Sequence, residues 1–287
     1  MPYIYLISTI FCVASSSIFG GFYSRRTADK KDASALFGLL ELGTVFLLWA
    51  VLYATGFSFD VKVLPYSLFF AIFFAMGKIG KIFALRNGPV LLTALMIQAA
   101  LIAATLWWIV KGDADMTWRV GIGLVLISLA LWLCLYNGKK EEGKKISWKW
   151  LFFSLLAFVG NAGCTIVQKT QQDVFQKQHG NMLMFFATMM AFVLGLVIYI
   201  KSDRTDSKEI LKEQSGLPVL AGIGNVAMNY LVMLMVGLLS SSLVYPTLAV
   251  GGLIVTTLFS LFAFKEKMRW WQWIGVAIGI LATGLLS

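Results

Sequence analysis

The fold is decided by residues 215–264, which read SGLPVLAGIGNVAMNYLVMLMVGLLSSSLVYPTLAVGGLIVTTLFSLFAF. This stretch contains no Asp, Glu, Lys or Arg. An α-helix rises about 1.5 Å per residue, so roughly 20 residues cross the apolar core of a bilayer, and the stretch is long enough for two crossings. The run Ser240-Ser241-Ser242 lies near its centre and predicts a turn. We therefore expect a helical hairpin inside a membrane.

The composition of the whole chain agrees with this expectation. Of 287 residues, 59% are hydrophobic and 13% charged, and the mean hydropathy is +0.80. An ordinary soluble domain carries about 25% charged residues, so the composition excludes a soluble globular protein. The net charge of +10 would suggest a nucleic-acid partner in a soluble protein. In a membrane protein such charge collects in cytoplasmic loops, so we expect no nucleic-acid partner.

Apolar runs of membrane-spanning length recur along the chain. They predict an all-α membrane protein with ten transmembrane helices, because only helices and closed barrels satisfy their backbone groups inside a bilayer. The first run lacks a basic leader, so we expect a retained helix and not a cleaved signal. The predicted helices cover residues 3–23, 34–56, 63–85, 89–110, 118–136, 148–169, 181–200, 217–238, 242–264 and 270–287.

Basic residues divide the predicted loops into two groups. Alternate loops hold most of the Lys and Arg, although one of them has Arg86 alone, and the loops between them hold only Lys62, Lys111, Arg119 and Lys177. By the positive-inside rule the rich loops face the cytoplasm and both termini lie outside. One of the basic loops is a linker at residues 139–147, and it separates residues 1–138 from residues 148–287.

The two halves resemble each other. Sliding the chain by about 146 residues places STIFCVASSS at residues 8–17 over SLLAFVGNAG at residues 154–163, with apolar and small residues in register. Five helices per half is an odd number, so the second half enters the membrane from the opposite side. The sequence therefore predicts two inverted five-helix repeats, an arrangement typical of transporters.

Ionisable residues inside the predicted spans are few, and such residues usually face the interior of a bundle. Glu41 is the acid well within a helix, and Lys78 and Lys81 lie three residues apart on another. Two interpretations of Glu41 and Lys78 stay open. Either they form a structural ion pair, or Glu41 binds a proton or cation while Lys78 attracts a carboxylate of a solute. For Lys81 we expect a side chain that extends to the membrane interface.

Neutral polar residues also occur at helical spacing. Asn161 and Gln168 belong to a stripe on one face, and Asn225 and Asn229 are four residues apart. Such faces avoid lipid and either bond neighbouring helices or line a wet cavity. We expect a cavity for a small polar or amphipathic organic solute, with these substrate-binding residues: Ser15, Gln98, Asn161, Gln168, Asn225, Asn229, Tyr230 and Tyr245.

Signals for an enzyme are missing. The chain has no GxxxxGK[ST] phosphate loop and no HExxH motif, and His179 is its one histidine. Cys12, Cys134 and Cys164 lie in apolar runs, so we expect no metal and no cofactor. A membrane-embedded lipid-modifying enzyme and a non-transporting assembly partner remain the alternatives to a transporter. A GxxxG motif at residues 275–279 leaves monomer and homodimer open.

Several segments together resemble the drug/metabolite transporter superfamily, specifically its bacterial EamA-type members. They are FALRNGPV at residues 83–90, GLLSSSLVYP at 237–246, FKEK at 264–267 and WIGVAIG at 273–279. The resemblance covers essentially the whole chain. It implies a secondary transporter or exporter in the bacterial cytoplasmic (inner) membrane, surrounded by lipid, with its solute site between the halves. Transferred by position, it supports Ser15, Glu41, Lys78, Gln98, Asn161, Asn225, Asn229 and Tyr245 as lining residues.

The resemblance leaves two points open. The pair Lys78 and Lys81 departs from the general pattern of the family and leaves open whether the solute is anionic. Proton coupling and facilitated exchange also remain alternatives.

Overall fold

The structure is a computed structural model that describes residues 2–88, 90–112, 117–135, 147–235, 238–239, 241–263 and 269–286. In these ranges it contains eleven α-helices, one short 3₁₀ helix and no β-strand. A helix lies at each of the ten predicted ranges. The elements are α1(Pro2–Arg26), α2(Ala33–Thr55), η1(Val61–Val63), α3(Leu64–Asn87), α4(Val90–Lys111), α5(Trp118–Leu135), α6(Trp148–Val174), α7(Gly180–Lys201), α8(Ser207–Gln214), α9(Gly216–Met235), α10(Ser241–Ala263) and α11(Trp270–Leu286).

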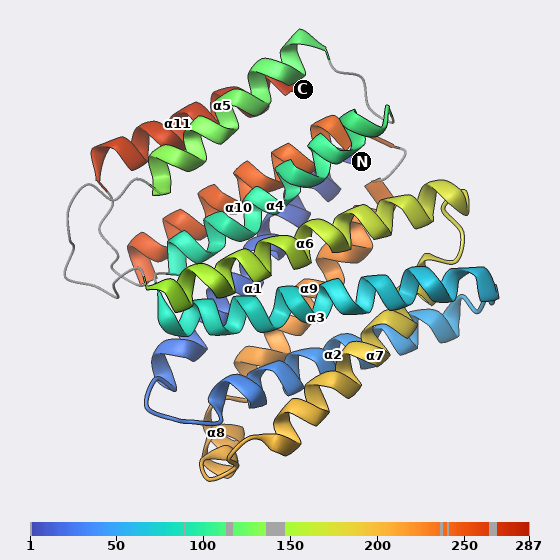
Figure 1. Cartoon of the computed structure of the whole chain (residues 1–287), viewed down its shortest axis with the longest axis vertical. Coiled ribbons are helices and arrows are strands. Elements are labelled where there is room, and N and C mark those ends of the chain that lie inside the picture. Colours follow the sequence, from blue (N-terminus) through green and yellow to red (C-terminus); the bar gives the residue numbers. More distant parts are fainter. Residues whose placement is uncertain are drawn as a thin grey trace.

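The helices form a bundle of side-by-side pairs (Figure 1). Helices α3 and α6 pack together at its centre, and α1 packs on α9. The pair α2 and α7 covers one side, and α4 and α10 cover the other. The pair α5 and α11 lies at the far edge and contacts α4 and α10.

The connections alternate between the two ends of the bundle. Those after α1, α3 and α7 lie at the left in Figure 1, and those after α2 and α6 lie at the right. The start of α1 and the end of α11 lie near the N and C labels, at the upper ends of these helices in the view. Of the basic linker at 139–147, only Ser147 is described.

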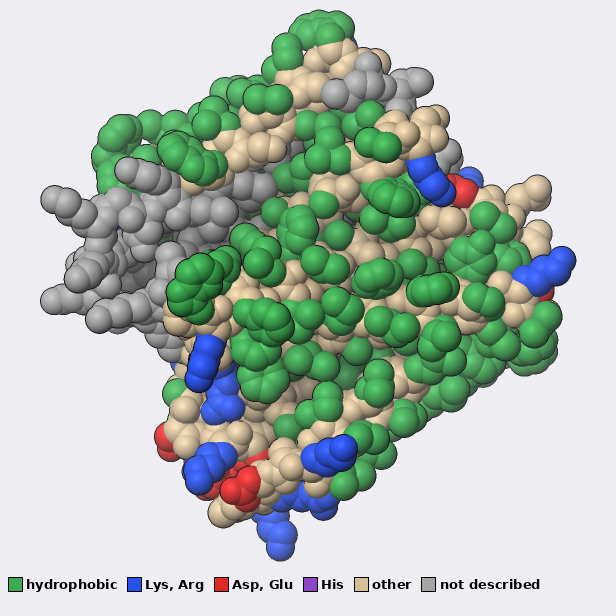
Figure 2. Space-filling view, viewed as in Figure 1, with side chains coloured by type: hydrophobic (Ala, Val, Ile, Leu, Met, Phe, Trp, Pro, Cys, Tyr) green, Lys and Arg blue, Asp and Glu red, His purple; other side chains and the backbone are tan. Residues whose placement is uncertain are grey.

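The outer surface is apolar over the length of the helices, and charged side chains gather near their ends (Figure 2). Large hydrophobic side chains such as Leu47, Phe152 and Val193 are exposed. Within the described residues, α1, α2, α3, α6, α7 and α9 are long and apolar enough to cross a membrane. Shorter apolar stretches lie in α4, α5 and α10. An exposed apolar surface of this extent requires lipid, so the protein is a multi-pass membrane protein.

Helix α8 was not predicted, because its eight residues are polar on average. It buries Ile210 against Leu36, Phe37 and Ala221. The Nζ atom of Lys30 lies 2.6 Å from Glu209 Oε2, and this hydrogen bond raises the pKa of the Lys30 ammonium. Helix α8 therefore connects the α1–α2 loop to the beginning of α9.

Glycines allow α3 and α6 to approach closely. A methyl group at Gly80 would lie 2.5 Å from the backbone nitrogen of Ala157, and one at Gly160 would lie 2.2 Å from that of Gly77. Both distances are below the contact distance of any real side chain, so only glycine fits. The succession of these contacts shows that α3 and α6 run antiparallel. This contact fixes which side chains of both helices face the interior.

Candidate functional site

A cavity lies among α1, α3, α4, α6, α9 and α10. The space between its lining atoms, including its mouth, is about 920 Å³. Its wall is mostly apolar, with a small number of polar groups, as is usual for a binding site for an organic molecule. Six of the predicted site residues line it: Lys78, Asn161, Gln168, Asn225, Asn229 and Tyr245.

Glu41 lies at the end of a chain of polar contacts beside this cavity. Its side chain is 0% exposed, and its Oε1 atom accepts hydrogen bonds from Lys78 Nζ and, at 3.1 Å, from Ser16 Oγ. Its Oε2 atom is buried and has no partner among the described residues. Glu41 and Lys78 therefore form an ion pair away from water, where breaking the pair is costly.

The prediction for Lys81 was wrong. Its side chain does not extend to the interface: it is 6% exposed, lines the cavity and donates a hydrogen bond to Ser16 Oγ. The reason is that α1 covers this side of α3: Lys81 bonds Ser16, and a methyl group at Gly20 would lie 4.0 Å from Lys81 Cε. The three-residue spacing from Lys78 was the signal that both lysines share one face.

Two amides of the cavity wall donate hydrogen bonds within their own helices. Asn161 Nδ2 donates to the carbonyl of Ala157 at 2.7 Å, and Asn229 Nδ2 donates to that of Asn225 at 2.9 Å. By contrast, Gln168 Nε2 and Tyr245 Oη are buried and have no partner among the described residues. Unpaired buried donors are costly and mark places where a ligand or water binds.

Other predicted residues lie elsewhere. Ser15 Oγ donates to the carbonyl of Cys12 at 2.7 Å and lies against Gly224, and its neighbour Ser16 lines the cavity instead. Tyr230 is 38% exposed, on the side of α9 that faces Trp49. The side chain of Gln98 is outside the described residues.

No described group of three or more His, Cys, Asp or Glu side chains could hold a metal ion. His179, in the connection between α6 and α7, has its Nδ1 atom 2.9 Å from Oγ of Ser58, in the connection after α2. The described residues that line the cavity offer ammonium, amide, hydroxyl, thiol and aromatic groups, the thiol being that of Cys164.

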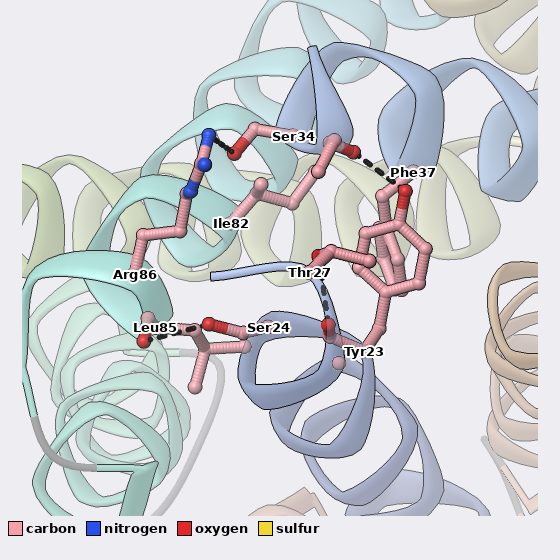
Figure 3. Close-up of a pocket in the computed structure, with 10 residues that line it drawn as sticks. Tyr23, Ser24, Thr27, Ser34, Phe37, Ile82, Leu85 and Arg86 are labelled. Carbon is pink, nitrogen blue, oxygen red and sulfur yellow. Dashed lines mark hydrogen bonds between the residues drawn. The ribbon is translucent and has the colours of Figure 1, made fainter. Parts of the chain in front are cut away.

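A second cavity of about 260 Å³ lies among α1, α2 and α3 (Figure 3). Its polar groups bond to one another: Arg86 Nη1 donates to Ser34 Oγ at 3.0 Å and Ser24 Oγ to the carbonyl of Leu85 at 3.2 Å. The smaller cavity therefore presents fewer free polar groups than the larger one. We take the larger cavity as the candidate site.

Comparison with known proteins gives the fold alone. No family model matches the chain. No curated protein matches it either. Among solved structures, 28 chains match. One of them, described as "Crystal structure of protein", has a TM-score of 0.63 and 11% sequence identity. The match covers 97% of this chain and 96% of the other, so the whole bundle has a counterpart of known structure.

Proposed function

We propose that this protein is a secondary transporter of small polar or amphipathic organic solutes, an EamA-type member of the drug/metabolite transporter superfamily. In this proposal ten helices span the bacterial inner membrane, with the basic loops in the cytoplasm, and the protein exports its solute. The observation that carries it is the cavity at the interface of the two halves. Its lining comes from α1, α3 and α4 of the first half and from α6, α9 and α10 of the second.

The packing supports the inverted repeat on which alternating access depends. If α1 to α5 are paired in order with α6, α7, α9, α10 and α11, each main contact maps onto another. The contact of α3 with α6 corresponds to that of α9 with α1, and α3 with α7 corresponds to α9 with α2. The pairs α2 with α7, α4 with α10 and α5 with α11 map onto themselves. Two equivalent bundles can exchange conformations around a site between them.

The lining of the cavity fits the same symmetry. The helices α1, α3 and α4 correspond to α6, α9 and α10, which are the other three lining helices. A site shared equally by both bundles is exposed alternately when the bundles rock against each other.

The test is transport by purified protein in proteoliposomes. A panel of amino acids, nucleosides, amines, sugars and organic acids is offered with and without a pH gradient. We expect saturable uptake of at least one solute, reduced about tenfold or more in Asn229→Leu, because the substitution removes an amide of the wall. Ile223→Leu, on the exposed side of the same helix, is the control and should transport normally. Equal transport by both variants, or no transport of any solute, would contradict the proposal.

A further inference from the structure

The charges buried around the cavity do not balance. Lys78 and Lys81 are each 6% exposed, and the carboxylate of Glu41 is their shared acidic neighbour. Lys169 is also buried, but it has its own partner, since its Nζ lies 2.8 Å from Asp173 Oδ2. With both lysines and Glu41 ionised, the cavity therefore carries one excess positive charge.

The hydrogen bonds leave donors available at this charge. Lys78 donates to Glu41, and Lys81 donates to Ser16, which in turn donates to Glu41. Each ammonium has three N–H donors and uses one in these contacts among the described residues. Both lysines line the cavity, so their remaining donors are beside the space where a solute would lie.

The wall next to the ammonium groups is aromatic. Phe70 and Phe74 line the cavity, and Lys78 Nζ lies 5.2 Å from the centre of the Phe74 ring. Such a wall accommodates the apolar body of an organic molecule while the ammonium groups hold its charged end.

Among the other polar groups of α6, Asn161 lies against Gly77, next to Lys78, whereas Gln168 lies farther along the bundle. Ala157 is level with Gly80, and Gln168 follows Ala157 by eleven residues along α6. At 1.5 Å per residue, Gln168 is about 16 Å from the level of Gly80 along the helix axis. The cavity therefore has a cationic end, beside which Asn161 lies, and an uncharged polar end at Gln168, with Phe70 and Phe74 between these levels.

We infer that the solute is an organic monoanion, a carboxylate whose negative group contacts the Lys81 ammonium. The inference rests on the proposed transport function and names its class of solute. One carboxylate neutralises the one excess charge, whereas a phosphate dianion would reverse its sign. A charged group in a dry site needs this compensation, since an isolated charge there is strongly disfavoured.

The test compares carboxylates with their neutral amides. The full chain in lipid nanodiscs is titrated with acetate, hexanoate, phenylacetate and 3-phenylpropionate, and with the corresponding amides, at constant ionic strength. Binding is followed through thermal unfolding and tryptophan fluorescence. We expect at least one acid to bind saturably and at least tenfold more tightly than its amide. No preference for any acid would overturn the inference.

Variants assign the preference to Lys81. Lys81→Met should abolish the preference for the acid, and Lys81→Arg should retain it. Lys169→Met is the matched control: it removes a buried lysine that has its own acid and should leave the preference unchanged. If Lys81→Met does not fold, Ser16→Ala provides the test, because the freed ammonium should bind the acid more tightly. A preference that survives in Lys81→Met, or falls in Ser16→Ala, would overturn the inference.

Transport assays separate this inference from the proposed function. Uptake of neutral solutes only, without binding of acids, would overturn the anion site and leave the transporter intact. Binding of an acid through Lys81 without any transport would support the anion site and contradict the transporter.

Discussion

Replacing Glu41 should damage the protein more than replacing its partner Lys78. The structure predicts this asymmetry because one carboxylate serves two lysines. Glu41→Gln leaves both ammonium groups without an acid. Lys78→Met instead leaves Glu41 and Lys81 joined through Ser16, with no net charge.

The expected magnitudes follow from burial. Removing one partner of a buried ion pair costs about 3–5 kcal/mol, and Glu41 is 0% exposed, so Glu41→Gln should lower the unfolding free energy by that amount. Lys78→Met loses one hydrogen bond to a charged group, worth about 1.5–3 kcal/mol, and gains charge balance. The double variant returns to one excess charge and should be more stable than Glu41→Gln alone.

The assay is thermal unfolding in detergent, followed by circular dichroism, together with uptake driven by a pH gradient. For a chain of this size the loss in Glu41→Gln corresponds to a fall in melting temperature of roughly 10 °C. Glu209→Gln is the control: it breaks a pair in which Glu209 is 55% exposed, so the melting temperature should stay close to that of the unaltered protein.

Two results would refute this reasoning. Equal losses in Glu41→Gln and Lys78→Met would show that the two lysines do not share the carboxylate. Full stability of Glu41→Gln with loss of the response to a pH gradient would show that Glu41 exchanges protons during transport and is not needed for packing.

Three further predictions concern the bundle. Gly80→Ala should prevent normal folding, because the added methyl group meets the backbone of Ala157, whereas Gly216→Ala, with no atom within 4 Å of its added methyl group, should fold normally. Size-exclusion chromatography compares the two variants. A normal elution profile for Gly80→Ala would contradict the close packing of α3 on α6. A cysteine at Lys208 should react with an impermeant thiol reagent from the cytoplasm and one at Lys177 from outside, in a background without native cysteines; the reverse result would invert the orientation. Gln168→Leu should raise the melting temperature and reduce transport, because it removes an unpaired buried donor that the solute would use; normal transport by this variant would exclude Gln168 from the site.

The sequence alone was sufficient to place the long apolar helices of the described residues. Uncharged runs such as residues 215–264 have no alternative in a bilayer, where each backbone group must bond within its own helix, and the structure has α9 and α10 there. Helix α8 was missed because its stability comes from contacts of Ile210 with distant helices, which local composition does not record.

Only the tertiary structure decided which side chains of each helix face the cavity. Successive residues of a helix point about 100° apart. The hydroxyl of Ser15, the predicted residue, therefore lies against Gly224, whereas that of its neighbour Ser16 contacts Glu41 and Lys81. That rotation depends on contacts between helices far apart in the chain. The packing of α3 against α1 likewise buries Lys81, which contacts Ser16 and whose Cε atom lies 4.0 Å from the place of a methyl group at Gly20. Hydropathy is a property of single segments and determines that a helix forms, whereas its rotation about its own axis is a property of the packed pair.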